Sequence, residues 1–171
     1  MIRGFVACVP LMAGFRWGLG SVHRVRSHLQ YQRVAAYAVI IREGLILLSR
    51  LAPSITPREM WTLPGGGIDF GEDPAAAVVR EVHEETSLVA QVGGPIHIGS
   101  AQRVVDENVD MHSVRIVFQA TVPADSPPPR VVEVAGSTID ARWHRLSDVL
   151  DRSVPLVEWA RAAILAHEQV I

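Results

Sequence analysis

The stretch GGGIDFGEDPAAAVVREVHEETSL, from Gly65 to Leu88, decides how this chain of 171 residues is interpreted. Three glycines begin it, and Asp73-Pro74 follows as a helix start. The Asp side chain can cap free amides, and proline at the first helical position loses no hydrogen bond. The apolar spacing predicts a helix over residues 74–86. Its apolar face is formed by Ala75, Val78, Val79 and Val82.

Three glutamates crowd the end of this predicted helix. Glu81, Glu84 and Glu85 stand at i, i+3 and i+4, so their side chains project from one face. Like charges at this spacing repel by about a few tenths of a kcal/mol per pair, and the helix C-terminus disfavours anions. Such a face is either solvated or bound to a hard divalent cation, Mg²⁺ or Mn²⁺, which can bridge carboxylates to substrate phosphates.

The spacing of the whole stretch resembles the Nudix box, the signature of the Nudix hydrolases. The matching positions are Gly66, Glu72, Arg80, Glu81, Val82, Glu84, Glu85 and Leu88. Ser87 stands where the family has a final glycine, so we expect a slightly altered helix end, because glycine adopts a left-handed backbone more easily. The box covers Gly66–Leu88, and the resemblance extends from about Val34 to the C-terminus, with Trp143 after a late strand.

The resemblance implies a metal site and a catalytic role for several acids. Glu81, Glu84 and Glu85 would bind Mg²⁺ or Mn²⁺, with the backbone carbonyl of Gly65 as a further ligand. Arg80 would orient a glutamate through a salt bridge. The proton acceptor would be a box glutamate, Glu84 or Glu85, or an acid in a later loop. Glu133 is the first candidate for this late acid and Asp140 the second, although each also fits a solvated loop residue.

Substrate contacts are also implied. Gly66 and Gly67 would let the backbone approach the phosphates, and Glu72 would support the loop or a second metal. Trp61, Phe70 and Tyr37 could stack on a base or sugar, while Tyr37 fits the core equally well.

The sequence outside the box predicts an α+β fold with a mixed sheet, which in the Nudix resemblance becomes an α/β/α sandwich. Arg33–Ile41 and Leu45–Ser49 read as a hairpin turning at Glu43-Gly44. Further strands are expected at 61–63, 89–100, 112–122 and 141–146. A loop is expected over 133–140, a turn after Leu146, and a terminal helix over 156–168.

Composition sets the boundaries and the partners. Residues 1–33 contain five arginines and no acid, so all 18 acidic residues lie in the remainder. We divide the chain into a basic extension, 1–30, and a single domain, 31–171. The extension is interpreted as a flexible segment or as the product of an upstream start codon. A tether to membrane or RNA is the alternative. Its apolar run is too short for a membrane span.

The acidic body argues against binding to extended nucleic acid, and one cysteine fits a cytoplasmic location. The function that the resemblance implies is Mg²⁺- or Mn²⁺-dependent hydrolysis of a diphosphate bond in a nucleoside diphosphate linked to another group. The substrate would be a small molecule: a nucleotide, a nucleotide sugar or a nucleoside triphosphate. The alternative is a Nudix-fold module that senses nucleotides without cleaving them. A homodimer is expected from the resemblance alone.

Overall fold

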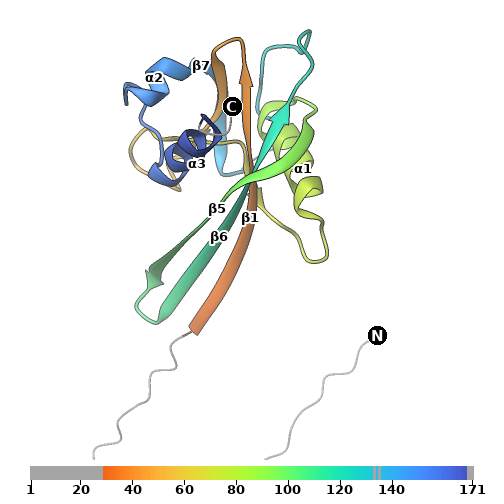
Figure 1. Cartoon of the computed structure of the whole chain (residues 1–171). Helices are drawn as coiled ribbons and strands as arrows, with labels where there is room; N and C mark the ends of the chain where they lie inside the picture. Colours follow the sequence, from red (N-terminus) through yellow and green to blue (C-terminus); the bar gives the residue numbers. More distant parts are fainter. Residues whose placement is uncertain (1–28, 133, 135, 169–171) are drawn as a thin grey trace, which may run out of the picture.

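The fold is built on one curled seven-stranded mixed sheet (Figure 1). The computed structural model describes residues 29–132, 134 and 136–168. The strands follow the order β3-β2-β1-β6-β5, with β4 paired to β1 and β7 paired to β2. They are β1 (Leu29–Arg42), β2 (Leu45–Leu51), β3 (Trp61–Thr62), β4 (Gly65–Gly67), β5 (Gln91–Asp106), β6 (Val109–Thr121) and β7 (Thr138–Arg145). The helices are α1 (Pro74–Thr86), α2 (Leu146–Leu150) and α3 (Glu158–Glu168).

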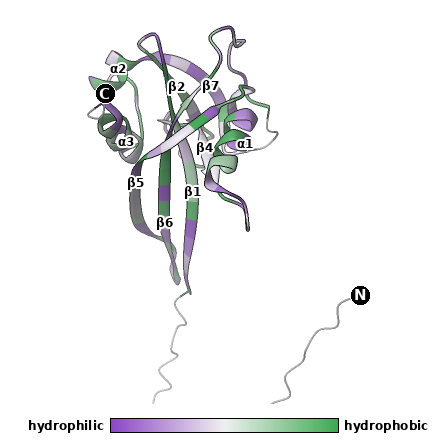
Figure 2. Cartoon of the chain, turned by 45° about the vertical axis from the view of Figure 1, so that its right-hand side comes forward, coloured by the Kyte–Doolittle hydropathy of each residue, from purple (hydrophilic) through white to green (hydrophobic). Residues whose placement is uncertain are grey.

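The central strand β1 buries both of its faces, which explains its nearly continuous apolar sequence. Ala36, Ala38 and Ile40 pack in one cluster with Val78 and Val82 of α1. The alternate residues Ala35, Tyr37 and Val39 pack in a second cluster with Ala160 and Ile164 of α3. Figure 2 shows hydrophobic stretches of β1 and β6 between the two helices. Helices therefore cover both faces, and the prediction of an α/β/α sandwich with a mixed sheet is confirmed.

The predicted hairpin is present, but it is short. Only Ile41↔Ile46 and Arg42↔Leu45 pair, around Glu43 and Gly44 with φ angles of 51° and 73°. Positive φ at both central residues is the geometry that matches the twist of a two-residue hairpin. Beyond the turn β1 pairs in parallel with β6, and β2 pairs with β7.

Strand β4 was not predicted, because its three glycines carry no apolar pattern. It lies antiparallel to β1, with Tyr37 opposite Gly65. A Cβ at Gly65 would come within 2.3 Å of the Ala36 carbonyl oxygen, and the φ angle there is 136°. Only glycine fits this close approach of two backbones.

Helix α1 has the predicted bounds. The Asp73 carboxylate accepts hydrogen bonds from the amides of Ala75 and Ala76 at 2.8 and 3.4 Å. Ser87 ends the helix in the left-handed conformation, with φ of 60°, as expected for the position where the family has glycine. The buried apolar face uses Ala77, whereas Val79, which we had placed there, is exposed.

Several other boundaries differ from the prediction. The arm formed by the outer parts of β1, β5 and β6 (Figure 1) makes β1 and β5 longer than expected. Strand β7 begins at Thr138, inside the predicted loop, and the turn after Leu146 is the short helix α2. The predicted extension, 1–30, lies outside the described residues except for Leu29 and Gln30. None of the helices described is long and apolar enough to cross a membrane.

Replacing Ser87 with glycine should raise the free energy of unfolding by about 0.5–1 kcal/mol, because glycine adopts the left-handed backbone without a steric cost. Equilibrium urea unfolding measures the change. The control is Ser100→Gly, at an exposed strand position without positive φ, which should lower stability. Equal destabilisation by both variants would contradict this account of the helix end.

Candidate active site

The guanidinium of Arg80 lies at the centre of the predicted acidic cluster. Its Nε and Nη2 each donate to Glu72 at 2.9 Å, and Nη2 also donates to the Gly67 carbonyl at 2.9 Å. Nη1 donates to Glu81 at 3.0 Å and to Glu84 at 3.3 Å. Arg80 therefore offsets the repulsion among the helix acids and ties the loop after β4 to α1.

Glu72 is the structural partner of this arginine. The hydrogen bond from Arg80, followed by one from the Asp69 amide at 2.9 Å, lowers the pKa of Glu72 to about 2. The contact with Glu72 also raises the pKa of Arg80 above its ordinary value. The pair is thus fully charged at neutral pH. This pair joins the loop after β4 to α1; a role of Glu72 in supporting the loop or a second metal stays a prediction.

Glu85 differs from its neighbours because its carboxylate is buried, with 2% of the residue exposed. Ser49 Oγ donates to it at 2.8 Å, the Gly65 amide donates at 3.1 Å, and Thr138 Oγ1 donates to the other oxygen. Burial raises the pKa of Glu85 to about 7, although these three hydrogen bonds act in the opposite direction.

The glycine strand sits directly against the acidic helix face. A Cβ at Gly66 would lie 2.5 to 2.6 Å from the carboxylate atoms of Glu81. The carboxylate of Glu81 thus occupies the space that a side chain at residue 66 would need. This contact explains why the stretch requires glycine at residue 66.

The oxygen atoms gathered here suit a hard divalent cation. Glu81 and Glu84 both contact one nitrogen of Arg80, so a positive charge already lies between them. Among the residues that the structure describes, no three acidic, His or Cys side chains converge on one point. Mg²⁺ commonly uses one or two protein carboxylates and completes its shell with water and substrate phosphates. The donor set therefore fits Mg²⁺ or Mn²⁺.

A cavity of about 560 Å³ lies beside this cluster. Gly65, Gly66 and Glu85 line it from the box side. Residues of β1, β2, β3, β5, β6, α3 and the neighbouring loops line the rest. They include Tyr37 and Trp159, whose ring centres are 4.5 Å apart. The volume lies within the range of about 300–1,000 Å³ that is usual for small-molecule sites.

The structure separates two predicted substrate residues from this cavity. Trp61 is 3% exposed and belongs to the core, with its indole ring 4.4 Å from the ring of His144. Phe70 is fully exposed in the loop before α1, and neither side chain lines the cavity. Both aromatic residues lie near the box in the sequence, which suggested stacking on a base or sugar. The sequence does not show whether such a side chain is buried or lines a cavity.

The late acids are only partly placed. Glu133 lies outside the described residues, although the preceding Val132 amide donates to the Glu84 carbonyl at 2.9 Å. This bond brings the loop to the end of α1. Asp140 lies on β7 and forms an ion pair with Arg142 at 2.8 Å.

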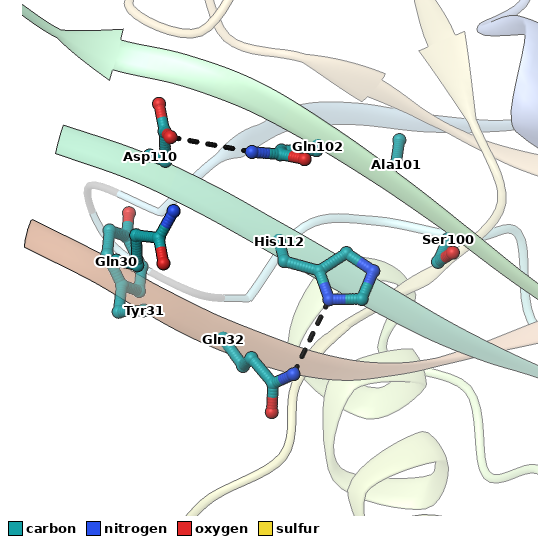
Figure 3. A pocket seen from close by; sticks show the side chains of 8 residues that line it. All are labelled: Gln30, Tyr31, Gln32, Ser100, Ala101, Gln102, Asp110 and His112. Carbon is teal, nitrogen blue, oxygen red and sulfur yellow. Dashed lines mark hydrogen bonds between the residues drawn. The ribbon is translucent and has the colours of Figure 1, made fainter.

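A second cavity, of about 470 Å³, lies between β1, β5 and β6 on the arm. None of the site residues predicted from the sequence lines it. Figure 3 shows its polar lining, in which Gln32 faces His112 and Gln102 donates to Asp110. No catalytic acid predicted from the sequence contributes to it.

Sequence reasoning missed the basic side chains of the first cavity. Arg33, Arg103 and Arg115 all line it. They are 70 and 12 residues apart in the sequence and meet only because β1 pairs with β6 and β6 with β5. Alternate residues of a strand share a face, but the register between the strands could not be read from the sequence.

Comparison with protein families matches residues 31–166 to the NUDIX domain. The chain belongs to this family. The resemblance that the box suggested is confirmed, and the 136-residue match extends well beyond the box.

Individual relatives share this fold over most of the described chain. A MutT NUDIX hydrolase from Burkholderia pseudomallei is 30% identical, with a TM-score of 0.63, and the match covers 80% of this chain and 98% of that one. A MutT protein from Methanosarcina mazei is 26% identical with a TM-score of 0.63, covering 82% and 95% of the two chains.

An RNA pyrophosphohydrolase from Cereibacter sphaeroides is 41% identical over 63 residues. This match covers 37% of the present chain and 38% of the relative. The chain thus matches little more than a third of the length of that curated relative.

Replacing Thr138 with valine should lower the free energy of unfolding by about 1–3 kcal/mol, because one oxygen of the buried Glu85 carboxylate loses its donor. Urea unfolding of metal-free protein measures the loss. Thr121→Val, at the exposed end of β6, is the matched control and should change stability by less than about 0.5 kcal/mol. Equal stability of the two variants would contradict the role of Thr138.

Arg80→Lys should destabilise the protein by about 1–2 kcal/mol, because an ammonium cannot reproduce the forked contacts to Glu72, Gly67 and the helix acids. The control is Arg142→Lys, which alters an exposed arginine that pairs with Asp140 and should have little effect. Thermal and urea unfolding measure both variants. A lysine that fully replaces Arg80 would show that charge alone, without the fork, holds the cluster.

Proposed function

We propose that this Nudix domain is a Mg²⁺- or Mn²⁺-dependent pyrophosphohydrolase that cleaves a diphosphate bond in a nucleoside diphosphate linked to another group. The observation that supports this proposal most is the pair of carboxylates, Glu81 and Glu84, that share one nitrogen of Arg80. The carboxylate of Glu81 lies against the glycine strand, which lines a cavity of about 560 Å³. The names of the relatives support the same chemistry. One of these relatives is an RNA pyrophosphohydrolase, and another is a MutT NUDIX hydrolase.

The metal would be held by Glu81 and Glu84, with the Gly65 carbonyl as the backbone ligand that the resemblance implies. When bound, Mg²⁺ or Mn²⁺ supplies neutralisation of the diphosphate charge and activation of water. Arg80 orients the two carboxylates through its contacts at 3.0 and 3.3 Å. Because Gly66 has no side chain, the carboxylate of Glu81 lies against β4, and the backbone of Gly66 and Gly67 would approach the phosphates.

Glu85 is our candidate for the proton acceptor. It lines the cavity, and a pKa of about 7 suits a group that takes up and releases a proton at neutral pH. In the hydrolysis the oxygen of water bonds to phosphorus and the bridging P–O bond breaks. The carboxylate takes the water proton, and the leaving phosphate carries the electron pair. A role of Glu85 as a metal ligand stays a prediction, and so does a role of Glu133 as the proton acceptor.

The substrate we propose is a small nucleotide rather than extended nucleic acid. Cavity volume and the acidic body support this choice. The match to the RNA pyrophosphohydrolase supports the diphosphate chemistry but covers only 38% of that protein, so we do not extend its RNA specificity to this chain. The division at residue 31, a cytoplasmic location and a homodimer also stay predictions.

The alternative hypothesis is a nucleotide sensor that does not cleave its ligand. A sensor has no need for a pair of metal-binding carboxylates, a buried carboxylate and an orienting arginine together. All of these groups are present and in contact through Arg80 and β4. The hydrolase therefore explains more of the site.

Glu84→Gln should reduce metal-dependent turnover at least about 100-fold, because it removes one of the two charges that hold the metal. Phosphate or pyrophosphate release from a nucleotide panel is measured with Mg²⁺, with Mn²⁺ and with chelator. Glu168→Gln, at the exposed end of α3, is the control and should retain wild-type turnover.

Turnover that persists in Glu84→Gln, or that is insensitive to chelator, would contradict the proposal. A folded wild-type protein that cleaves no nucleotide in the panel but binds one of them would instead support the sensor.

A further inference from the structure

One wall of the cavity carries three arginines, which we call the arginine wall: Arg33 on β1, Arg103 on β5 and Arg115 on β6. They surround Ser113, which also lines the cavity. Arg33 pairs directly with Ser113 across the strands, Arg115 follows Ser113 by two residues, and Arg103 pairs with Met111 two residues before it. Residues at these positions share one face of a sheet.

The hydroxyl of Ser113 indicates that this wall is built to receive a ligand atom. Ser113 is 1% exposed, and its Oγ has no hydrogen-bond partner. Buried polar side chains almost always have one. A hydroxyl can donate one hydrogen bond and accept two, so an oxygen acceptor placed between the arginines would satisfy it.

The arginine wall carries positive charge without a direct ion pair among the described residues: no salt bridge joins any of its three guanidinium groups to a carboxylate. Burial lowers the pKa of Arg115, and the charges of Arg33 and Arg103 lower it further, while Tyr37 acts in the opposite sense. An anion bound here would relieve this repulsion.

The wall also has a fixed position relative to the box. The guanidinium carbon of Arg115 lies 5.0 Å from the centre of the Trp159 ring, a cation–π contact that restrains it. A Cβ on Gly67 would lie 3.6 Å from Nη2 of Arg33, so this guanidinium reaches the glycine strand. The wall therefore begins next to the proposed metal site and continues along the arm.

We propose that Arg33, Arg103, Arg115 and Ser113 form a subsite for a phosphate group beyond the diphosphate that is cleaved. Arginine pairs with phosphate through two parallel hydrogen bonds, which a neutral sugar does not offer. The inference rests on the proposed function, because it names the substrate class of the same cavity. The preferred substrates carry at least three phosphates, either as a terminal chain or as a bridge between two nucleosides.

The direct test is binding of inorganic pyrophosphate to the full chain in the presence of chelator, measured by calorimetry. Metal and turnover play no part in this measurement. Arg33→Gln and Arg103→Gln should each weaken binding about tenfold, the effect of losing a charge-assisted hydrogen bond. Arg145→Gln, an exposed arginine at the end of β7 that does not line the cavity, should bind as the wild type does.

Ser113→Ala separates a ligand-binding hydroxyl from a structural one. Because Oγ has no partner in the unliganded protein, the thermal unfolding midpoint should stay the same or rise. Pyrophosphate binding should weaken severalfold. A lower midpoint with unchanged binding would overturn the role of Ser113.

Kinetics with Mg²⁺ then connect the subsite to the substrate. In Arg33→Gln and Arg103→Gln, KM should rise about tenfold for nucleoside triphosphate or for diadenosine tetraphosphate. An increase for the triphosphate identifies a terminal phosphate chain as the ligand, and an increase for diadenosine tetraphosphate identifies a bridging chain. KM for ADP-ribose, which has two phosphates, should be unchanged. An equal KM increase for ADP-ribose would contradict a subsite for a further phosphate.

The two proposals fail in different ways. Pyrophosphate binding that depends on the arginine wall, without turnover of any nucleotide, would leave the anion subsite in place and refute the hydrolase. Turnover that requires Glu84, with pyrophosphate binding unchanged in both arginine variants, would support the hydrolase and refute the subsite.

Discussion

The contact on which the site depends joins the Arg80 guanidinium to Glu72, Gly67, Glu81 and Glu84. Three glutamates on one helix face repel one another, and they lie where the helix dipole also disfavours them. Arg80 supplies the opposing charge without leaving the helix, and its fork holds the loop after β4 in the same contact. The cluster is thus stable enough to exist before any cation arrives.

Two glycines of β4, Gly65 and Gly66, allow the close backbone contacts around this cluster. Gly65 allows β4 to lie against β1, and Gly66 allows the carboxylate of Glu81 to approach the strand. The Gly65 amide then donates to Glu85, which is buried by the same close approach. Backbone proximity therefore does two things at once. It brings the carboxylate of Glu81 against β4, and it removes the carboxylate of Glu85 from water.

The sequence predicted the local features and missed the long-range ones for a physical reason. Asp73, Ser87 and the bounds of α1 follow from capping and backbone preferences, which act over a few residues. The box spacing led to the correct family and to the acid cluster. Trp61 is buried in the core and Phe70 is exposed without lining the cavity. Neither could be predicted locally, because burial depends on strands that are distant in the chain. The arginine wall depends on the β1–β6–β5 register, which no local pattern contains.

We infer that Glu81 and Glu84, which Arg80 holds together, bind a divalent cation. Mn²⁺ binding to the full chain, followed by electron paramagnetic resonance of the free ion, tests it most directly. The account predicts that Glu81→Gln weakens Mn²⁺ binding at least about tenfold, while the exposed-site variant Glu168→Gln binds as the wild type does. Equal affinity in all three proteins would contradict the account and leave the cluster as a charged surface neutralised by Arg80 alone.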